Sequence, residues 1–171
     1  MGRPIRIGIS SCLLGQEVRY DGGHKYDPSL ADMFGQPVEW VPICPEVEAG
    51  LGTPREPMHL VRVGGDVRLL TVTTGRDLTG DLDAFAGRRL DAIAREHLSG
   101  YVLKADSPSC GVERVKVYER DAFERTGRGR FAAALVARYP DLPVEDEARL
   151  AEPRLRRDFV DRVIAYSRRS A

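Results

Sequence analysis

The sequence lacks several features that would place it in a broad class of protein. No apolar run approaches the roughly 18 residues of a membrane-spanning helix, and the segment from Met1 to Ser11 is too short and too interrupted by charge and proline for a secretory signal. A net charge of zero, from 26 basic and 26 acidic residues, gives no electrostatic reason to expect a nucleic acid or a membrane surface as partner. We therefore expect a cytoplasmic protein with no membrane partner.

Cysteine is also scarce. The chain has 3 cysteines, an odd number that cannot all pair in disulfides, and thiols stay reduced in the cytoplasm. No Cys-x-x-Cys pair of the ferredoxin type is present, and neither is a Walker or dinucleotide-binding motif. A disulfide framework is therefore the weakest explanation of the cysteines, and nucleotide binding through a standard glycine-rich loop is not indicated.

The pattern of apolar residues predicts an α/β fold. With 171 residues and 42% hydrophobic content, the chain is long enough to bury the core of one domain. Because strands alternate with helices, we expect a single compact domain with a Rossmann-like, largely parallel sheet and flanking helices. Strands are predicted at residues 5–12, 38–44, 67–72, 101–105 and 115–118, helices at residues 29–34, 77–98, 131–139 and 153–167, and a long loop at residues 45–57.

The three cysteines occupy equivalent places in this pattern. Cys12, Cys44 and Cys110 each follow an apolar segment that is predicted to be a strand. In an open parallel sheet the ligand crevice lies outside the carboxyl ends of the strands. Three cysteines that are far apart in sequence can therefore converge on one metal site.

Two interpretations of the cysteines stay open at this point. Free cysteines often behave as small buried hydrophobes, although the Ser, Pro and Gly neighbours of these three are typical of turns and not of core strands. Three thiolates also suit a zinc ion with a bound water, or an iron–sulfur cubane in which one iron lacks a protein ligand. Either metal centre leaves an open Lewis-acid position for a substrate.

Three separated motifs carry a resemblance to a known family. They are Ser-Ser-Cys-Leu-Leu-Gly at residues 10–15 with Val-Arg-Tyr-Asp-Gly at 18–22, Cys-Pro-Glu at 44–46 with Gly-Leu at 50–51 and Pro-Arg at 54–55, and Leu-Lys at 103–104 with Ser-Pro-Ser-Cys-Gly at 107–111. Together they resemble the thiouracil desulfidase family, over a stretch from about Ile5 to Leu150. The order of the motifs makes the similarity specific.

The resemblance implies a cofactor and a reaction. It implies a 4Fe-4S cluster held by Cys12, Cys44 and Cys110, with the fourth iron free to take the sulfur of thiouracil or thiouridine in a non-redox reaction that releases sulfide. By the same resemblance Glu46 is the candidate base that activates water, and Ser107 assists proton transfer or substrate placement. The further candidate substrate-binding residues are Ser11, Arg19, Arg55, Lys104 and Ser109.

The resemblance also suggests a division of the chain. Residues 1–150 correspond to the desulfidase catalytic domain, and residues 151–171 to a basic C-terminal helix like the junction that, in longer relatives, leads to a domain associated with thiolated tRNA. We expect a small thiolated pyrimidine as substrate, as base, nucleoside or nucleotide, with tRNA possible but not favoured. The alternatives are a non-catalytic iron–sulfur sensor or binding protein, the catalytic part of a tRNA thiouridine desulfidase, and a zinc hydrolase.

Overall fold

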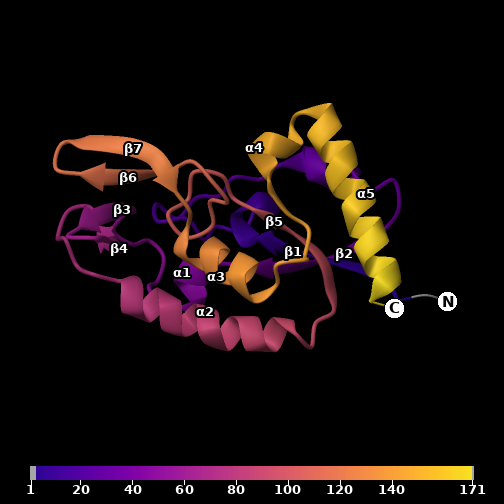
Figure 1. Ribbon diagram of the computed structural model, residues 1–171, viewed down its shortest axis with the longest axis horizontal. Coiled ribbons are helices and arrows are strands. Elements are labelled where there is room, and N and C mark those ends of the chain that lie inside the picture. Colours follow the sequence, from indigo (N-terminus) through magenta and orange to yellow (C-terminus); the bar gives the residue numbers. More distant parts are fainter. Residues whose placement is uncertain (1–2, 171) are drawn as a thin grey trace.

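Four parallel strands form the sheet that carries the cysteines. A computed structural model describes residues 3–170, so residues 1–2 and 171 of the two predicted domains lie outside the described part. Sheet A has the order β2-β1-β5-β8, and every neighbouring pair in it is parallel. Its members are β1 (Ile5–Ser10), β2 (Val38–Ile43), β5 (Leu98–Leu103) and β8 (Val144–Asp146). The predicted α/β fold with a parallel sheet is confirmed (Figure 1).

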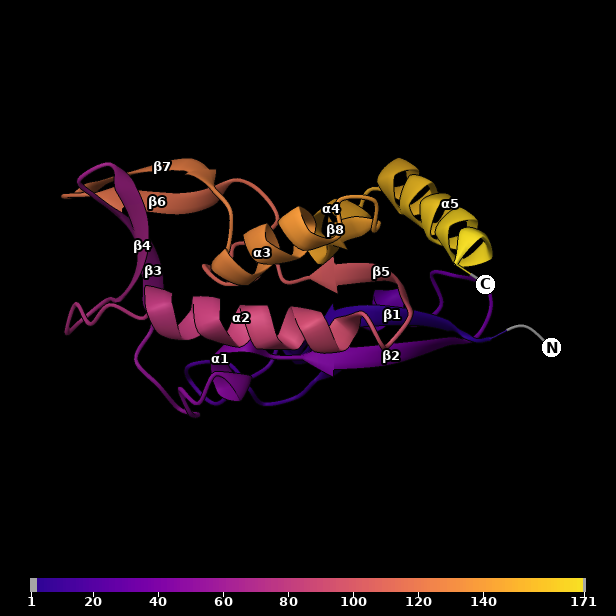
Figure 2. The same ribbon diagram turned by 60° about the horizontal axis from the view of Figure 1, so that its bottom comes forward.

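The strand order of sheet A creates a crevice. The chain runs from β1 outward to β2 and then returns to the other side of β1 for β5. In such a sheet ligands bind where the direction of winding reverses, outside the carboxyl ends of the strands. This switch point lies between β1 and β5. Figure 2 shows the arrows of β1, β2 and β5 pointing the same way, toward the second sheet.

The second sheet is mixed and has the order β4-β3-β6-β7. Strands β3 (Met58–Val63) and β6 (Val115–Glu119) are parallel, while β4 (Asp66–Thr71) and β7 (Ala122–Gly127) pair with them antiparallel. The sequence predicted β4 and β6 but neither β3 nor β7. In β7 no side chain is buried, so this strand lacks the apolar alternation that reveals a half-buried strand.

Helices cover both faces of sheet A. Helices α2 (Thr79–Ile93) and α3 (Arg130–Arg138) pack on one face and α5 (Pro153–Arg169) on the other (Figures 1 and 2). The first layer buries Phe85, Leu90, Tyr101, Leu103, Phe131 and Leu135, and the second buries Ile7, Ile9, Val102, Leu150, Phe159 and Val163. Because Phe159 and Val163 belong to this core, α5 is packed on the sheet. The division of the chain at residue 150 stays a prediction.

The sequence placed the end of α2 too late. The helix ends at Ile93, and β5 begins at Leu98 after a turn in which His97 has a φ of 54°. All six residues of β5 are buried, and a short apolar run that is buried on all sides cannot be told from the stripe of a buried helix by periodicity. Gly100 lies within β5, where a Cβ would come within 2.7 Å of Val163 on α5.

Two other segments also differ from the prediction. The helix expected at residues 29–34 is only a 3-10 helix, η2 (Pro28–Leu30), followed by turns. The loop expected at residues 45–57 opens with a helical turn, α1 (Pro45–Glu48), whose N-cap is Cys44. The proline at the first helical position has no amide hydrogen to leave unpaired, so this turn begins directly at the end of β2.

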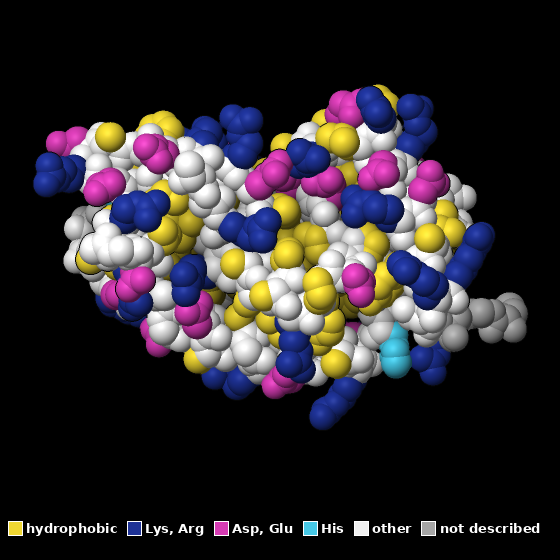
Figure 3. All heavy atoms as spheres, in the orientation of Figure 1, with side chains coloured by type: hydrophobic (Ala, Val, Ile, Leu, Met, Phe, Trp, Pro, Cys, Tyr) yellow, Lys and Arg dark blue, Asp and Glu magenta, His cyan; other side chains and the backbone are white. Residues whose placement is uncertain are grey.

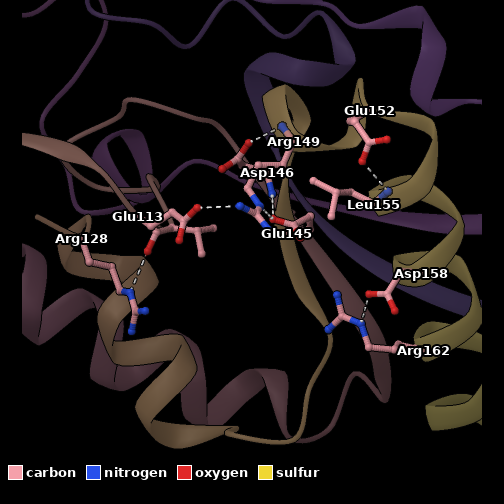
Figure 4. Close-up of polar contacts among 10 residues, drawn as sticks. Glu113, Arg128, Glu145, Asp146, Arg149, Glu152, Leu155, Asp158 and Arg162 are labelled. Atoms are coloured by element: carbon pink, nitrogen blue, oxygen red, sulfur yellow. Dashed lines mark hydrogen bonds and ion pairs between the residues drawn. The ribbon is translucent and has the colours of Figure 1, made fainter. Parts of the chain in front are cut away.

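A short helix, α4 (Glu147–Leu150), begins directly after β8, at the carboxyl end of the fourth strand of sheet A. Asp146 accepts a hydrogen bond from the Arg149 backbone as N-cap, and the Arg149 guanidinium pairs with Glu145 and Glu113 at 2.7 and 2.8 Å (Figure 4). Burial raises the pKa of both Glu145 and Asp146, and Arg149 acts against that rise. These contacts fix the chain where it leaves sheet A.

The surface carries mixed charge. Figure 3 shows acidic and basic side chains interspersed over one face of the molecule, in keeping with the zero net charge. Within residues 3–170 there is no helix with the length and hydropathy needed to cross a membrane.

Candidate functional site

One cavity collects the three cysteines. Cys12 lies on the 3-10 helix η1 (Ser11–Leu14) that follows β1, Cys44 directly follows β2, and Cys110 lies in the turn after β5. All three line the same cavity of about 460 Å³, at the carboxyl ends of sheet A. Met58, the first residue of β3, and Pro57, which precedes it, also line the cavity. The structure thus brings together three cysteines that are distant in sequence.

The three thiols are free, and none is more than 8% exposed. Burial raises the pKa of Cys12, raises the pKa of Cys44 to about 12, and raises the pKa of Cys110 well above its usual value. The Glu46 carboxylate is the second cause for Cys44 and Cys110, because it repels a thiolate. Arg19 and Lys104 lower the pKa of Cys12, and Arg55 lowers that of Cys44, but burial outweighs them, so these thiols are protonated at neutral pH unless a metal binds them.

Glu46 enters the cavity from α1. It is 8% exposed, lines the cavity, and its Oε2 accepts a hydrogen bond from Cys44 Sγ at 3.5 Å. Within residues 3–170 its carboxylate forms no ion pair. A buried carboxylate that no cation holds is free to accept a proton from a bound molecule.

The two candidate serines of the third motif have different surroundings. Ser107 lines the cavity, and its Oγ accepts hydrogen bonds from the backbone amides of Ser109 and Cys110 at 3.2 and 3.0 Å. It therefore shapes the turn that carries Cys110 and keeps its own proton available for donation. Ser109 is fully buried, does not line the cavity, and its Oγ has no hydrogen-bond partner among the described residues.

The other candidate substrate-binding residues all reach the cavity. Ser11, Arg19, Arg55 and Lys104 line it. Lys104 Nζ is bound to Glu147 at 2.6 Å, and Arg55 donates to the carbonyl oxygens of Val18 and Gly52. Arg19 stacks on the Tyr20 ring at 5.8 Å and forms no ion pair with any residue in the range 3–170. The cavity thus has three basic residues in its lining besides the carboxylate of Glu46, and we call these three, Arg19, Arg55 and Lys104, the basic rim.

Sequence reasoning missed two residues that support the site. Ser10, the last residue of β1, accepts a hydrogen bond from the Lys104 amide at 2.9 Å. Glu147 binds the Lys104 ammonium with one oxygen and the Ala105 amide with the other, at 2.6 and 2.7 Å. Ser10 had a visible clue, since it belongs to the first motif. Glu147 had none, because its partner Lys104 lies 43 residues away, directly after β5.

Gly129 fixes the backbone of the cysteine turn and yields a prediction. It precedes α3, and a Cβ at this position would collide with the backbone of Ser109 and Cys110, which cannot move aside like a side chain. We expect Gly129→Ala to lower the free energy of unfolding by about 1–3 kcal/mol and to reduce iron uptake, because the turn with Cys110 must shift. Denaturant unfolding and iron analysis measure the two effects.

The matched control is Gly87→Ala on α2. Gly87 is exposed and a Cβ there would meet nothing within 4 Å, so alanine should stabilise the protein by about 0.5–1 kcal/mol. Equal iron uptake by Gly129→Ala and the natural protein would show that the turn tolerates the displacement.

Within residues 3–170, no three His, Cys, Asp or Glu side chains are grouped closely enough to hold a single metal ion. The three cysteines therefore share a cavity without meeting at one point. The cubane that the resemblance implies binds thiolates at separate irons and does not require such a meeting.

Comparisons with known proteins agree with the motifs. The model of the 2-thiouracil desulfurase family matches residues 7–147. The chain is 31% identical over 135 residues to the uncharacterized protein YbbK of Bacillus subtilis (strain 168), which covers 75% of this chain and 88% of that protein.

A solved structure is also similar. It is a [4Fe-4S]-dependent thiouracil desulfidase, TudS, with 34% sequence identity and a TM-score of 0.68, and the match covers 88% of this chain and 95% of that one. The region that the family model matches, residues 7–147, includes all three sequence motifs and every residue that lines the cavity. The chain belongs to the 2-thiouracil desulfurase family.

Proposed function

We propose that this protein is an iron–sulfur-dependent, non-redox desulfidase that removes sulfur from thiouracil or thiouridine compounds and releases it as sulfide. The observation that carries the proposal is the convergence of three buried cysteines and the buried carboxylate of Glu46 on one cavity. Membership of the desulfurase family supports the reaction, and the cofactor of the similar solved structure supports a 4Fe-4S cluster.

The residues of the cavity fit such a cluster. Cys12, Cys44 and Cys110 supply three soft sulfur ligands, and burial favours their neutral form until a cation replaces the protons. When bound, the cluster supplies a soft Lewis-acid iron without a protein ligand, which prefers the thiocarbonyl sulfur of a substrate to the carbonyl oxygen of the product.

Glu46 is the proposed general base. Its carboxylate takes a proton from a water molecule, which adds to the ring carbon that bears the sulfur, and the C–S bond then breaks. The carbon gains the oxygen of water and the sulfur leaves as sulfide, so no electron is transferred to or from the protein. Ser107, with a free hydroxyl proton at the cavity wall, passes a proton to the ring or orients the substrate.

The basic rim is proposed to bind the rest of the substrate. Arg19, Arg55 and Lys104 offer donors to a pyrimidine oxygen or a phosphate, and Ser11 lines the same wall. A cavity of about 460 Å³ is in the usual range for small-molecule sites. We propose a thiolated base, nucleoside or nucleotide as substrate, with a role on tRNA as the less favoured alternative, and we place the reaction in the cytoplasm, where thiols stay reduced.

Anaerobic reconstitution tests the proposal. The purified protein is loaded with iron and sulfide without air, its iron content is measured, and sulfide release is followed with 2-thiouracil, 4-thiouracil, thiouridine and thiouridine monophosphate. We expect sulfide and the matching oxygen-containing pyrimidine in equal amounts from at least one compound. A fully loaded protein that releases no sulfide from any of them overturns the proposal.

A further inference from the structure

One aromatic residue lines the cavity. Among the residues that form the cavity wall, Tyr20 alone has an aromatic side chain. It is 40% exposed, so a large part of its surface is open to a bound molecule. Within residues 3–170 its ring forms no pair with another aromatic ring. The cavity therefore has an aromatic surface that is not part of the packed core.

The backbone around Tyr20 is held in place. The carbonyl oxygen of Tyr20 accepts a hydrogen bond from the Arg55 amide at 2.7 Å, and the Arg55 guanidinium binds the Val18 carbonyl oxygen at 2.8 Å. A turn begins at Arg19, whose amide donates to the carbonyl oxygen of Gly23 at 3.1 Å. A tyrosine has only two side-chain torsions, so a ring on a fixed backbone loses little freedom when a ligand binds.

The loop that carries Tyr20 borders the cysteines. The Val18 carbonyl oxygen, two residues before Tyr20, accepts a hydrogen bond from Cys44 Sγ at 3.9 Å. The Arg19 guanidinium lies 5.8 Å from the centre of the Tyr20 ring and has no ion-pair partner within residues 3–170. A cation and an aromatic ring thus lie together on a loop that contacts a proposed metal ligand.

A pyrimidine offers two kinds of surface to a binding site. Its hydrogen-bonding groups lie at the edge of the ring, whereas both faces are π surfaces that stack on aromatic side chains. Glu46, Ser107 and the basic rim are partners for the edge, and none of them is aromatic. Proline and methionine side chains also line the cavity, but a flat ring is best covered by another flat ring. Tyr20 is therefore the group that matches a face of the pyrimidine.

We propose that Tyr20 is a substrate-binding residue that stacks on the pyrimidine ring while the sulfur is removed. The inference rests on the proposed function and adds the residue that recognises the ring and not the sulfur. A stack on the face depends little on whether the edge carries sulfur or oxygen, or on whether a ribose is attached. Tyr20 thus contributes binding that is equal in the ground state and the transition state, which lowers KM and leaves kcat unchanged.

Tyr20→Ala tests the proposal in the cluster-loaded protein, kept without air. Equilibrium dialysis measures the binding of uracil and uridine monophosphate, which have no sulfur to release. We expect Tyr20→Ala to weaken the binding of both on the order of tenfold, in the range found when a base-stacking ring is removed. KM for 2-thiouracil should rise by the same factor with little change in kcat. Tyr20→Phe keeps the ring and should bind both probes like the natural protein.

The matched control is Tyr26→Ala. Tyr26 lies in the same segment between η1 and η2 and is 56% exposed, but it does not line the cavity. Its removal should therefore change neither the binding of the two probes nor KM. Melting temperatures and iron contents show that each variant is folded and equally loaded.

The outcomes separate this inference from the proposed function. Equal binding of uracil by Tyr20→Ala and the natural protein overturns the role of Tyr20 even if sulfide is released, and so does a natural protein that binds neither probe. An equal loss in Tyr20→Phe assigns the effect to the hydroxyl, and an equal loss in Tyr26→Ala assigns it to the loop, so either result overturns the stack. A loss for uridine monophosphate alone also overturns it, because the ring then contacts the ribose or the phosphate.

A loss for both probes in Tyr20→Ala, which Tyr20→Phe and Tyr26→Ala do not share, supports the stack. This result stands even if the natural protein releases no sulfide, in which case only the proposed reaction fails.

Discussion

Cys110→Ala is expected to abolish both cluster retention and desulfurisation. Cys110 is the most deeply buried of the three cysteines, at 4% exposure, and it lies in a turn whose backbone is fixed by Ser107 and packed against Gly129. No other cysteine is available to replace it, since the chain has only 3. Anaerobic purification followed by iron and sulfide analysis should give little iron, and sulfide release should fall to the rate of cluster-free protein.

The loss must be separated from a folding defect. Val163→Ala truncates a fully buried residue of α5 on the opposite face of sheet A, so it should lower stability by a comparable or larger amount while iron and activity are retained. Cys12→Ala and Cys44→Ala should behave like Cys110→Ala. If Cys110→Ala keeps full iron and turns over, Cys110 is a core residue and the three-cysteine site is wrong.

The sequence predicted the part of the site that depends on strand ends. Apolar runs before Cys12 and Cys44 mark strands, and the parallel arrangement then brings their carboxyl ends to one edge of the sheet. These are local patterns with a general geometric consequence. For this reason the cysteine cavity followed from the sequence without any metal-binding motif of closely spaced residues.

Two strands of the second sheet, β3 and β7, did not follow from the sequence. Strand β7 has no buried residue, and in β3 only Leu60 is buried while Arg62 and Val63 are exposed, so neither strand shows a regular alternation of buried and exposed residues. These strands are held by pairing with β4 and β6, which is a property of the folded chain. The wall of the cavity that β3 provides was therefore invisible from the sequence.

The contacts between strand ends were equally hidden. Ser10 meets Lys104, and Lys104 meets Glu147, across separations of 94 and 43 residues. A serine, a lysine and a glutamate are unremarkable as residue types, and only the order β1-β5-β8 makes them neighbours. Sequence patterns thus pointed to the cysteines and Glu46 as candidate site residues, and the fold showed which other residues hold the strand ends together.

Glu46→Gln is expected to lower turnover by about 10²–10⁴-fold, the usual contribution of a general base, with the cluster retained. Glutamine keeps the size of the side chain and an acceptor oxygen for the Cys44 thiol at 3.5 Å, but it cannot take a proton from water. The fall should appear in both kcat and kcat/KM, because the lost interaction is made only in the transition state. Sulfide release by protein with matched iron content is the measurement.

The control for charge is Glu39→Gln. Glu39 lies on β2, outside the cavity and paired with Arg6 on the surface, so this variant has the same change in net charge without touching the site. It should turn over like the natural protein.

A Glu46→Gln protein with a full cluster and undiminished turnover would assign the base to another group of the cavity. A rise in KM alone would make Glu46 a binding residue. Loss of turnover with an intact cluster distinguishes the desulfidase from a protein that only carries the cluster, because the cysteines serve both and the carboxylate serves only the reaction.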